Sequence, residues 1–237
     1  MIETVKLSKR LKKVATYVPE GALFADIGTD HAYLPCYICL HDEKARAIAG
    51  EVNEGPFNSA VETVHLYGLS DSIEVRLGNG LEVVENEEVN QLVIAGMGGA
   101  LIRSILEDGI SKLNAVNRIV VQPNIDARTI RKWFLIHGFT VTNEAILEEN
   151  GHIYEIIVAD RGENRSPYDA SLVDQQLLFG PLLMKNRTAT FYQKWKHEHE
   201  KLQTVINQMD KAKVKDIQKI NQFEKELKWM KEVLSDD

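Results

Sequence analysis

Residues 23–32, with the sequence LFADIGTDHA, decide the fold of this 237-residue chain. The stretch begins as a short apolar run, reaches Asp26 at its penultimate strand position and turns at Gly28. The residues that follow have the composition of a helix. A buried strand that leads through a glycine turn into a helix is the opening of a nucleotide-type βαβ unit. Glycine suits such a turn because it lacks Cβ and lets the backbone bend sharply beside a ligand.

The charge of this turn predicts a cationic ligand. Asp26 and Asp30 flank it, and no lysine or arginine occurs between Gly21 and Asp42. The dinucleotide fingerprint G-x-G-x-x-G is absent, and two carboxylates would repel a pyrophosphate. S-adenosylmethionine fits this environment, because its sulfonium and its ammonium are both positive. The alternative is an ordinary strand and turn whose carboxylates cap a helix.

The rest of the first 160 residues predicts an alternating α/β fold. Strands are expected at residues 45–51, 73–77, 91–95 and 118–122, and helices follow the turns after most of them. Two more strands, at residues 139–147 and 153–159, are joined by a segment that contains Asn-Gly, a strong hairpin signal. We therefore expect a Rossmann-like class I methyltransferase fold. Its sheet would be doubly wound, seven-stranded and mostly parallel, and would end in an antiparallel hairpin.

Polar residues follow these strands at the edge where a ligand would bind. Glu51 ends the second strand, where an acidic residue accepts hydrogen bonds from ribose hydroxyls. Asn79, in the loop after the third strand, has the amide donor and acceptor needed to read an adenine edge. Residues 96–99 read GMGG after the fourth strand, and such a run of glycines indicates a close approach of backbone to a ligand or a helix. Gln122 and Asn124 place neutral amides after the fifth.

The N-terminal residues 4–18 predict an amphipathic helix with a basic polar face. A basic helix that leads directly into the ligand-binding strand is well placed to hold a phosphodiester. A solvated helix face is the alternative explanation of the same pattern.

The composition changes after a polar linker at residues 161–167. Apolar residues recur at spacings of mostly 3 and 4 from residue 191 to residue 234, which predicts two antiparallel helices with a break near residues 210–215. We expect an S-adenosylmethionine-binding domain at residues 1–160 and a helical coiled-coil hairpin at residues 161–237. The hairpin is basic, so it could lie along a nucleic-acid backbone. It could equally cap the sheet or pair two chains.

The overall composition limits the class of protein and the compartment that we expect. The net charge of −7 argues against a broadly basic nucleic-acid protein. No apolar run approaches 18 residues, so we expect a soluble cytoplasmic protein without membrane contact. The only cysteines, Cys36 and Cys39, are separated by bulky apolar residues. That pattern favours core packing over zinc or redox chemistry, and no metal is expected.

Five motifs in this order resemble the bacterial tRNA (adenine-22-N1)-methyltransferase family, TrmK. They are DIGTDHAYLP at residues 26–35, AGEVNEGP at 49–56, GNGL at 78–81, AGMGG at 95–99 and QPN at 122–124. The C-terminal part is similar to that family's appendage by length and periodicity only. The resemblance implies that S-adenosylmethionine is the methyl donor and that tRNA is the substrate.

The resemblance also implies roles for individual residues. The cofactor-binding set comprises Asp26, Gly28, Thr29, Asp30 and His31 around the methionine end, Glu51 at the ribose with Val52 beside it, Asn79 and Gly80 at the adenine, and Ala95, Gly96 and Met97 along the methyl group. Asp30 is the candidate for stabilising the methylated, cationic base, while Gln122 and Asn124 would orient that base. We expect RNA to contact a basic rim formed by Lys9, Arg10, Lys12, Lys13, Arg128, Arg131 and Lys132.

Two other functions remain compatible with the residues. The first is a methyltransferase with a small-molecule or protein acceptor, which an acidic catalytic domain suits. The second is a non-catalytic adaptor that binds a nucleoside structurally and recruits partners through its coiled coil. The chain is expected to be a monomer, with a dimer through the coiled coil as the alternative.

Overall fold

The computed structural model describes residues 5–162, 165–212 and 214–235. A seven-stranded sheet with the order β3-β2-β1-β4-β5-β7-β6 runs through its centre. Strands β1 to β5 are parallel, and β7 pairs antiparallel with both β5 and β6. This confirms the predicted Rossmann-like sheet. The strands are β1 (Leu23–Ile27), β2 (Arg46–Glu51), β3 (Ile73–Leu77), β4 (Gln91–Gly98), β5 (Arg118–Ile125), β6 (Phe139–Glu149) and β7 (His152–Arg161).

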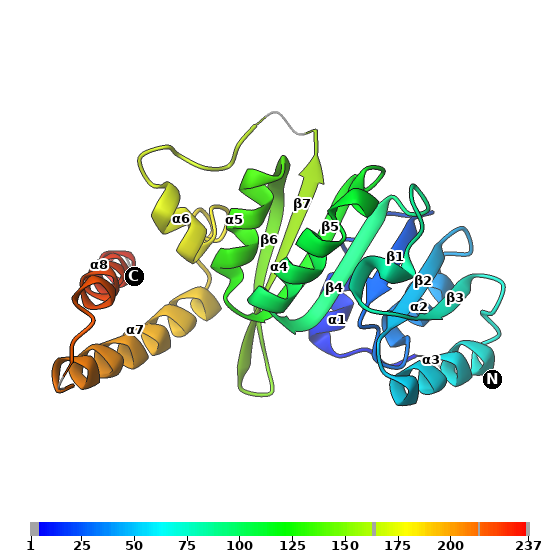
Figure 1. Ribbon diagram of the computed structural model, residues 1–237, viewed down its shortest axis with the longest axis horizontal. Coiled ribbons are helices and arrows are strands. Elements are labelled where there is room, and N and C mark those ends of the chain that lie inside the picture. Colours follow the sequence, from blue (N-terminus) through cyan, green and yellow to red (C-terminus); the bar gives the residue numbers. More distant parts are fainter. Residues whose placement is uncertain (1–4, 163–164, 213, 236–237) are drawn as a thin grey trace.

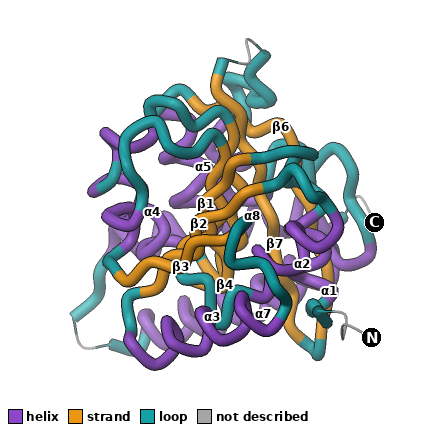
Figure 2. Tube along the Cα trace, turned by 90° about the vertical axis from the view of Figure 1, so that its right-hand side faces the viewer, coloured by secondary structure: helices purple, strands orange, loops and turns teal. Residues whose placement is uncertain are grey.

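Helices cover both faces of the sheet, and two long helices extend beyond its β6 edge (Figures 1 and 2). The α-helices are α1 (Lys9–Ala15), α2 (Tyr33–His41), α3 (Glu54–Leu66), α4 (Gly99–Asp108), α5 (Ala127–Ile136), α6 (Val173–Phe179), α7 (Ala189–Asp210) and α8 (Ile217–Leu234). Two short 3₁₀ helices, Gly80–Val83 and Ile110–Leu113, complete the elements.

Alternation along the central strands produces two hydrophobic cores. In β1, Phe24 packs with α1, α2 and α3 on one face, whereas Ala25 and Ile27 pack with α4 and α5 on the other. In β4, Val93 and Ile94 likewise point to opposite faces. Because helices bury both faces, these strands are mostly apolar, as in other parallel sheets.

The N-terminal helix is shorter than the sequence suggested. The prediction of a helix over residues 4–18 is wrong for residues 5–8 and 16–18, and residue 4 lies outside the described residues. Ser8 caps α1, because its hydroxyl accepts a hydrogen bond from the Leu11 N–H over 3.1 Å. Val5 and Leu7 precede this cap and are buried without being helical.

Two motifs expected in loops belong to strands. The glycine motif extends β4 to Gly98, and the QPN motif extends β5 to Ile125. The two strands stay paired past Ala95 because register shifts occur around Met97, which pairs with Pro123. The predicted hairpin is confirmed, and Asn150 and Gly151 at its tip have φ values of 54° and 78°. Positive φ at both positions is what a type I′ turn requires.

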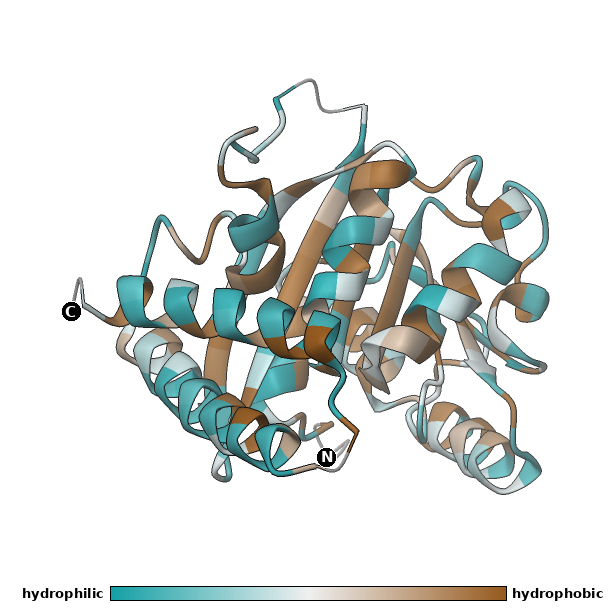
Figure 3. Cartoon of the chain, turned by 60° about the vertical axis from the view of Figure 1, so that its left-hand side comes forward, coloured by the Kyte–Doolittle hydropathy of each residue, from teal (hydrophilic) through white to brown (hydrophobic). Residues whose placement is uncertain are grey.

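The C-terminal part forms the two long helices that the periodicity predicted, separated by the expected break. A shorter helix, α6, precedes them and was not predicted. Phe179, Phe191, Trp195, Met230 and Val233 form a small separate core among these elements. Figure 3 shows largely hydrophilic outer surfaces on α7 and α8. The coiled-coil description stays a prediction, as does the boundary between domains at residue 160.

The described residues contain no helix that is both long and apolar enough to span a membrane. In the same ranges, no group of three His, Cys, Asp or Glu side chains is arranged to hold a metal ion. Cys36 and Cys39 are free thiols, and both are buried.

Candidate cofactor and adenine site

The turn after β1 brings the backbone close to its neighbours. The N–H groups of Gly28 and Thr29 donate to the carbonyl of Gly50, over 2.9 and 3.1 Å. Gly28 has a φ of 71°, and a Cβ there would collide with the methyl group of Met97. After Thr29, three consecutive residues also have positive φ, which is unfavourable for residues with a side chain; they are Asp30, His31 and Ala32. Such strain in consecutive residues motivates a functional assignment for this turn.

Asp26 places a buried carboxyl group at the carboxyl end of β1. Its side chain accepts a hydrogen bond of 2.7 Å from the hydroxyl of Thr29, and the residue is only 4% exposed. Burial raises the pKa of Asp26 to about 6, although the Thr29 hydrogen bond and the charge of Arg10 act in the opposite direction. A carboxylate in this environment gains more from a cationic ligand than an exposed one would.

Glu51 places a second buried carboxyl group at the end of the neighbouring strand, β2. Its Oε1 accepts hydrogen bonds from the backbone N–H groups of Val52 and Asn53, over 2.9 and 3.1 Å. These bonds hold the carboxylate in a fixed orientation. Beyond β3, Asn79 is exposed and caps the short helix that begins at Gly80. Carboxyl and amide groups thus follow consecutive strands, as the sequence predicted.

Side-chain amides join the ends of β4 and β5. The Oε1 atom of Gln122 accepts hydrogen bonds from the Gly96 N–H, over 3.1 Å, and from the guanidinium of Arg10. Its Nε2 donates to Oδ1 of Asn124 over 3.1 Å, and Nδ2 of Asn124 donates to the Gly96 carbonyl over 2.7 Å. Gln122 is fully buried, whereas Asn124 is exposed. The two amides therefore form one network.

The family model for the tRNA (adenine(22)-N(1))-methyltransferase TrmK matches residues 24–232. The chain belongs to the TrmK family. The resemblance drawn from the motifs is thereby confirmed, and it extends through the C-terminal helices as well.

Similar proteins agree with TrmK membership. The chain is 44% identical to the tRNA (adenine(22)-N(1))-methyltransferase of Bacillus subtilis (strain 168), over 97% of this chain and 98% of that protein. The crystal structure of B. subtilis TrmK covers 97% of this chain and 99% of its own, with a TM-score of 0.91 and 44% identity. Streptococcus pneumoniae Sp1610, solved in complex with S-adenosyl-L-methionine, has a TM-score of 0.84 and 42% identity and covers 97% of this chain and 100% of its own.

The structure revises the predicted basic rim of this TrmK chain. Lys9, Lys12 and Lys13 are exposed on α1, and Lys132 is exposed on α5. Arg131 is fully buried, so its assignment to an RNA-binding rim is wrong. The physical reason is helical spacing: residue 131 falls on the inward stripe of α5 together with residues 127, 130 and 134, which are also buried.

The two remaining arginines of that rim are engaged within the chain. Arg128 forms an ion pair of 2.7 Å with Glu226 of α8. Arg10 contacts Gln122, and its guanidinium lies 5.4 Å from the ring centre of Tyr154. The sequence placed Arg10 on the basic face of a helix and gave no sign that it would reach the site. Its position next to Gln122 follows from α1 packing beside the β6–β7 hairpin, where Glu149 accepts from the Lys9 N–H over 2.6 Å.

A groove of about 1150 Å³ lies between the end of β5, the start of β7 and the helices α7 and α8. Asn124 and Ile125 line it at the site, and Lys201 and Val205 line it on α7. Several cations in the groove have acidic partners: Arg128 pairs with Glu226, Lys194 with Glu155 and Lys201 with Glu198. The groove thus connects the TrmK site with the C-terminal helices.

Proposed function

We infer that this chain transfers the methyl group of S-adenosylmethionine to N1 of adenine 22 in tRNA. The observation that carries this conclusion is the TrmK family match across residues 24–232, over a fold with paired carboxylates at consecutive strand ends. Neither a small-molecule acceptor nor a purely structural nucleoside site has a comparable observation in its favour.

The side chains present fit S-adenosylmethionine. Asp26 is a buried carboxyl group whose pKa is raised to about 6, so a positive ligand would relieve the cost of its ionisation. Glu51 is held by backbone N–H groups at the strand end where an acidic residue can accept hydrogen bonds from ribose hydroxyls. When bound, S-adenosylmethionine supplies an electrophilic methyl group.

We propose a division of the cofactor site along the strand order. The turn after β1 would hold the methionine end, through Asp26, Gly28, Thr29, Asp30 and His31. Glu51 and Val52 would meet the ribose, and Asn79 with Gly80 would meet the adenine. Residues 95–97 would border the methyl group, and the contact of Met97 with Gly28 supports their closeness to the turn.

Adenine N1 lies on the Watson–Crick edge, so the base must leave its stack before it meets the methyl group. The N1 lone pair is already nucleophilic, and holding it about 3 Å from the methyl carbon removes much of the entropic barrier. We propose that the exposed Asn124 orients the base by exchanging its hydrogen bond to Gly96 for one to the base, while the fully buried Gln122 holds Asn124 in place. Asp30 is exposed at the mouth of the turn and would stabilise the positive charge of the methylated ring.

The substrate RNA would be held by the exposed lysines of α1 and α5, namely Lys9, Lys12, Lys13 and Lys132. Phosphate contacts of this kind position a nucleic acid without reading its sequence. We also propose that the enzyme acts as a monomer, because the C-terminal helices bury aromatic residues such as Phe191 and Trp195 within their own chain. It would act in the cytoplasm, where tRNA is modified.

Transfer of a tritium-labelled methyl group tests this function. The purified chain should label an unmodified tRNA that carries adenine at position 22. The same tRNA with guanine at that position is the matched control and should stay unlabelled. Equal labelling of both tRNAs, or label in protein or metabolites alone, would contradict the assignment.

A further inference from the structure

Helix α5 connects the site to the C-terminal helices. It begins at Ala127, three residues after Asn124, and projects Arg128 toward α8 and Arg131 toward the β6–β7 hairpin. Both arginines bind carboxylates from other elements. Within the described residues, both side chains are therefore engaged in contacts that join α5 to other elements.

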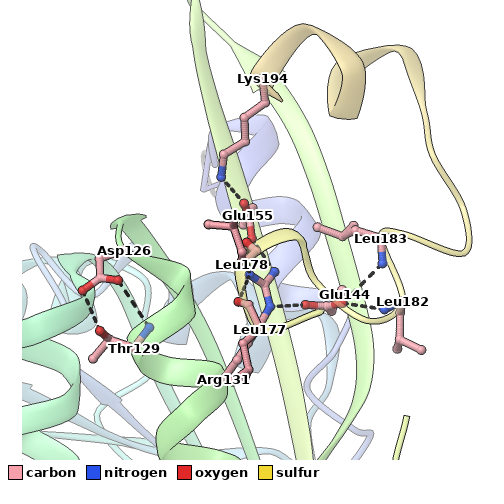
Figure 4. Close-up of polar contacts among 10 residues, drawn as sticks. All are labelled: Asp126, Thr129, Arg131, Glu144, Glu155, Leu177, Leu178, Leu182, Leu183 and Lys194. Atoms are coloured by element: carbon pink, nitrogen blue, oxygen red, sulfur yellow. Dashed lines mark hydrogen bonds and ion pairs between the residues drawn. The ribbon is translucent and has the colours of Figure 1, made fainter. Parts of the chain in front are cut away.

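Arg131 stands at the centre of a buried charged cluster (Figure 4). Its Nε donates to Glu144 of β6 over 2.6 Å, and its Nη2 donates to Glu155 of β7. Its Nη1 lies 3.4 and 3.3 Å from the carbonyl oxygens of Leu177 and Leu178, at the end of α6. One guanidinium thus joins α5 to both strands of the hairpin and to α6.

The carboxylates of this cluster reach further into the C-terminal part. Oε2 of Glu144 accepts from the backbone N–H groups of Leu182 and Leu183, over 2.8 and 3.3 Å. Glu155 also receives Lys194 from α7. Space in the cluster is tight, because a Cβ at Gly180 would lie 2.7 Å from Arg131 Nη2. The start of α7 is therefore fixed to the sheet by charged contacts as well as by packing.

Arg128 makes the corresponding contact to α8. Its Nη1 donates to Oε1 of Glu226 over 2.7 Å, and the same oxygen accepts from Gln222 over 3.0 Å. Glu226 is a buried residue on an otherwise mostly exposed helix. Thus α5 holds α7 indirectly through Arg131 and Glu155, and it holds α8 directly through Arg128.

Buried ion pairs add little net stability compared with apolar packing, because each charge loses its hydration. What they do supply is direction, since a guanidinium binds carboxylates only in the plane of its N–H groups. We propose that Arg128 and Arg131 are positioning residues that set where α7 and α8 stand relative to the Gln122–Asn124 end of β5. This inference rests on the proposed function, because the position matters for catalysis only if the helices help to seat the RNA.

The pair Arg128–Glu226 offers a test, because Arg128 is partly exposed and its variants should fold more securely than those of the fully buried Arg131. Arg128→Glu and Glu226→Arg should each raise the KM for tRNA about tenfold, while kcat and the cofactor Kd stay within about twofold. The double variant restores the ion pair with its charges exchanged. It should return the KM for tRNA to near the wild-type value.

The exchanged pair separates positioning from direct RNA contact. If Arg128 binds phosphate, a glutamate at that position would keep the KM high in the double variant, and the proposal would be overturned. A second pair of variants on α8 tests whether the loss of any negative charge is enough. Glu226→Gln removes the partner of Arg128, and its control, Glu224→Gln, removes the charge of an exposed residue one half-turn away. Only Glu226→Gln should raise the KM; equal effects of both would also overturn the proposal.

A distance measurement reads the helix position without RNA. Nitroxide labels on Glu62→Cys in α3 and Gln218→Cys in α8, both at exposed positions, can be introduced selectively, because burial raises the pKa of both native thiols, Cys36 and Cys39, to about 12. Double electron–electron resonance should give a narrow distribution of the distance between the two labels in the otherwise wild-type chain. The distribution should broaden in Arg128→Glu and narrow again in the exchanged double variant.

An unchanged distribution in Arg128→Glu would overturn the positioning role. So would a broadened distribution with no change in the KM for tRNA. If the wild-type chain failed to methylate tRNA, the proposed function would fail instead, and the distances would still decide whether the ion pair fixes the helices.

Discussion

The side-chain oxygen of Gln122 accepts a hydrogen bond from the Gly96 N–H over 3.1 Å, which ties the ends of β4 and β5 together inside the candidate site. Gly96 has a φ of 81° and interrupts the regular pairing of these strands. At this interruption the Gly96 N–H donates to the side chain of Gln122. Gln122 thus ties the strand ends together and also holds Asn124, the residue that we propose contacts the base.

Replacing Gln122 with alanine should destabilise the protein. The change leaves the Gly96 N–H and the Arg10 guanidinium without this buried acceptor, at a cost of about 2 kcal/mol in the free energy of unfolding. Asn124→Ala is the matched comparison and should cost less, because Asn124 is exposed to water. Urea denaturation measures both. Equal small losses would show that water replaces the Gln122 bonds.

The buried carboxyl group of Asp26 should lower the stability of the free protein near neutral pH and favour binding of the cationic cofactor. Its folded pKa of about 6 lies above the ordinary value of 3.8, so the folded state favours the protonated form. Asp26 therefore does not lower the free energy of unfolding at low pH, and it lowers it progressively as the pH rises from about 3.8 to about 6. At pH 7 the buried charge costs about 3 kcal/mol.

Asp26→Asn keeps the shape and the acceptor for Thr29 but removes this charge. At pH 7 the variant should be more stable than the wild type by up to about 3 kcal/mol, and the two should converge near pH 4. Its affinity for S-adenosylmethionine should fall. Thermal unfolding across this pH range and calorimetric titration measure the two effects. A variant that loses stability at pH 7 would show that Asp26 has a compensating partner in the free protein.

The sequence was sufficient for the sheet because its signals are local. Alternation in residues such as Phe24 and Ala25 predicts two buried faces, and Asn150-Gly151 predicts a turn with positive φ. The burial of Arg131 could not be predicted, because the sequence around a charged side chain does not indicate which residue will pair with it. Glu144 and Glu155 lie 13 and 24 residues away, and only the folded hairpin brings them to the arginine. The contact of Arg10 with Gln122 could not be predicted for the same reason, since Gln122 lies 112 residues away.

Glu51→Gln should weaken cofactor binding while leaving the local backbone intact. The glutamine oxygen can still accept from the Val52 and Asn53 N–H groups, but the charge offered to the ribose hydroxyls is lost. We expect affinity to fall by about 1.5–3 kcal/mol, the range for hydrogen bonds to charged groups. Glu54→Gln, at an exposed position on α3, is the control. Undiminished calorimetric affinity in Glu51→Gln would remove this residue from the site.

Replacing Lys12 and Lys13 together with glutamine should weaken tRNA binding uniformly across tRNA species. Both lysines are exposed on α1. Each lysine–phosphate interaction that is lost should flatten the slope of log K against log salt by about one unit, so the double replacement should flatten it by about two units. Cofactor affinity should stay unchanged. Titrations at several salt concentrations give the slope. If the slope keeps its wild-type value, the basic face of α1 is simply solvated.

Asp30→Asn separates cofactor binding from catalysis at the strained turn. Asp30 has a φ of 39° and a side chain that is 82% exposed, with its Oδ1 3.4 Å from Nε2 of His31. Asparagine tolerates this backbone conformation about as well as aspartate, so the variant should fold normally. If the carboxylate stabilises the methylated, positive adenine, single-turnover methyl transfer should fall by about tenfold to a thousandfold. Cofactor affinity should change far less.

The opposite pattern is equally measurable. A variant that binds the cofactor weakly but transfers methyl groups at the normal rate when saturated would make Asp30 a binding residue. In that case the charge on the base must be stabilised by other groups at the site. Asp26, which would need to be ionised above a pKa of about 6, is then the first to test. Because the cationic cofactor favours the ionised form of Asp26, methyl transfer at saturating cofactor would fall only at a pH below about 6, in the wild type and in Asp30→Asn alike.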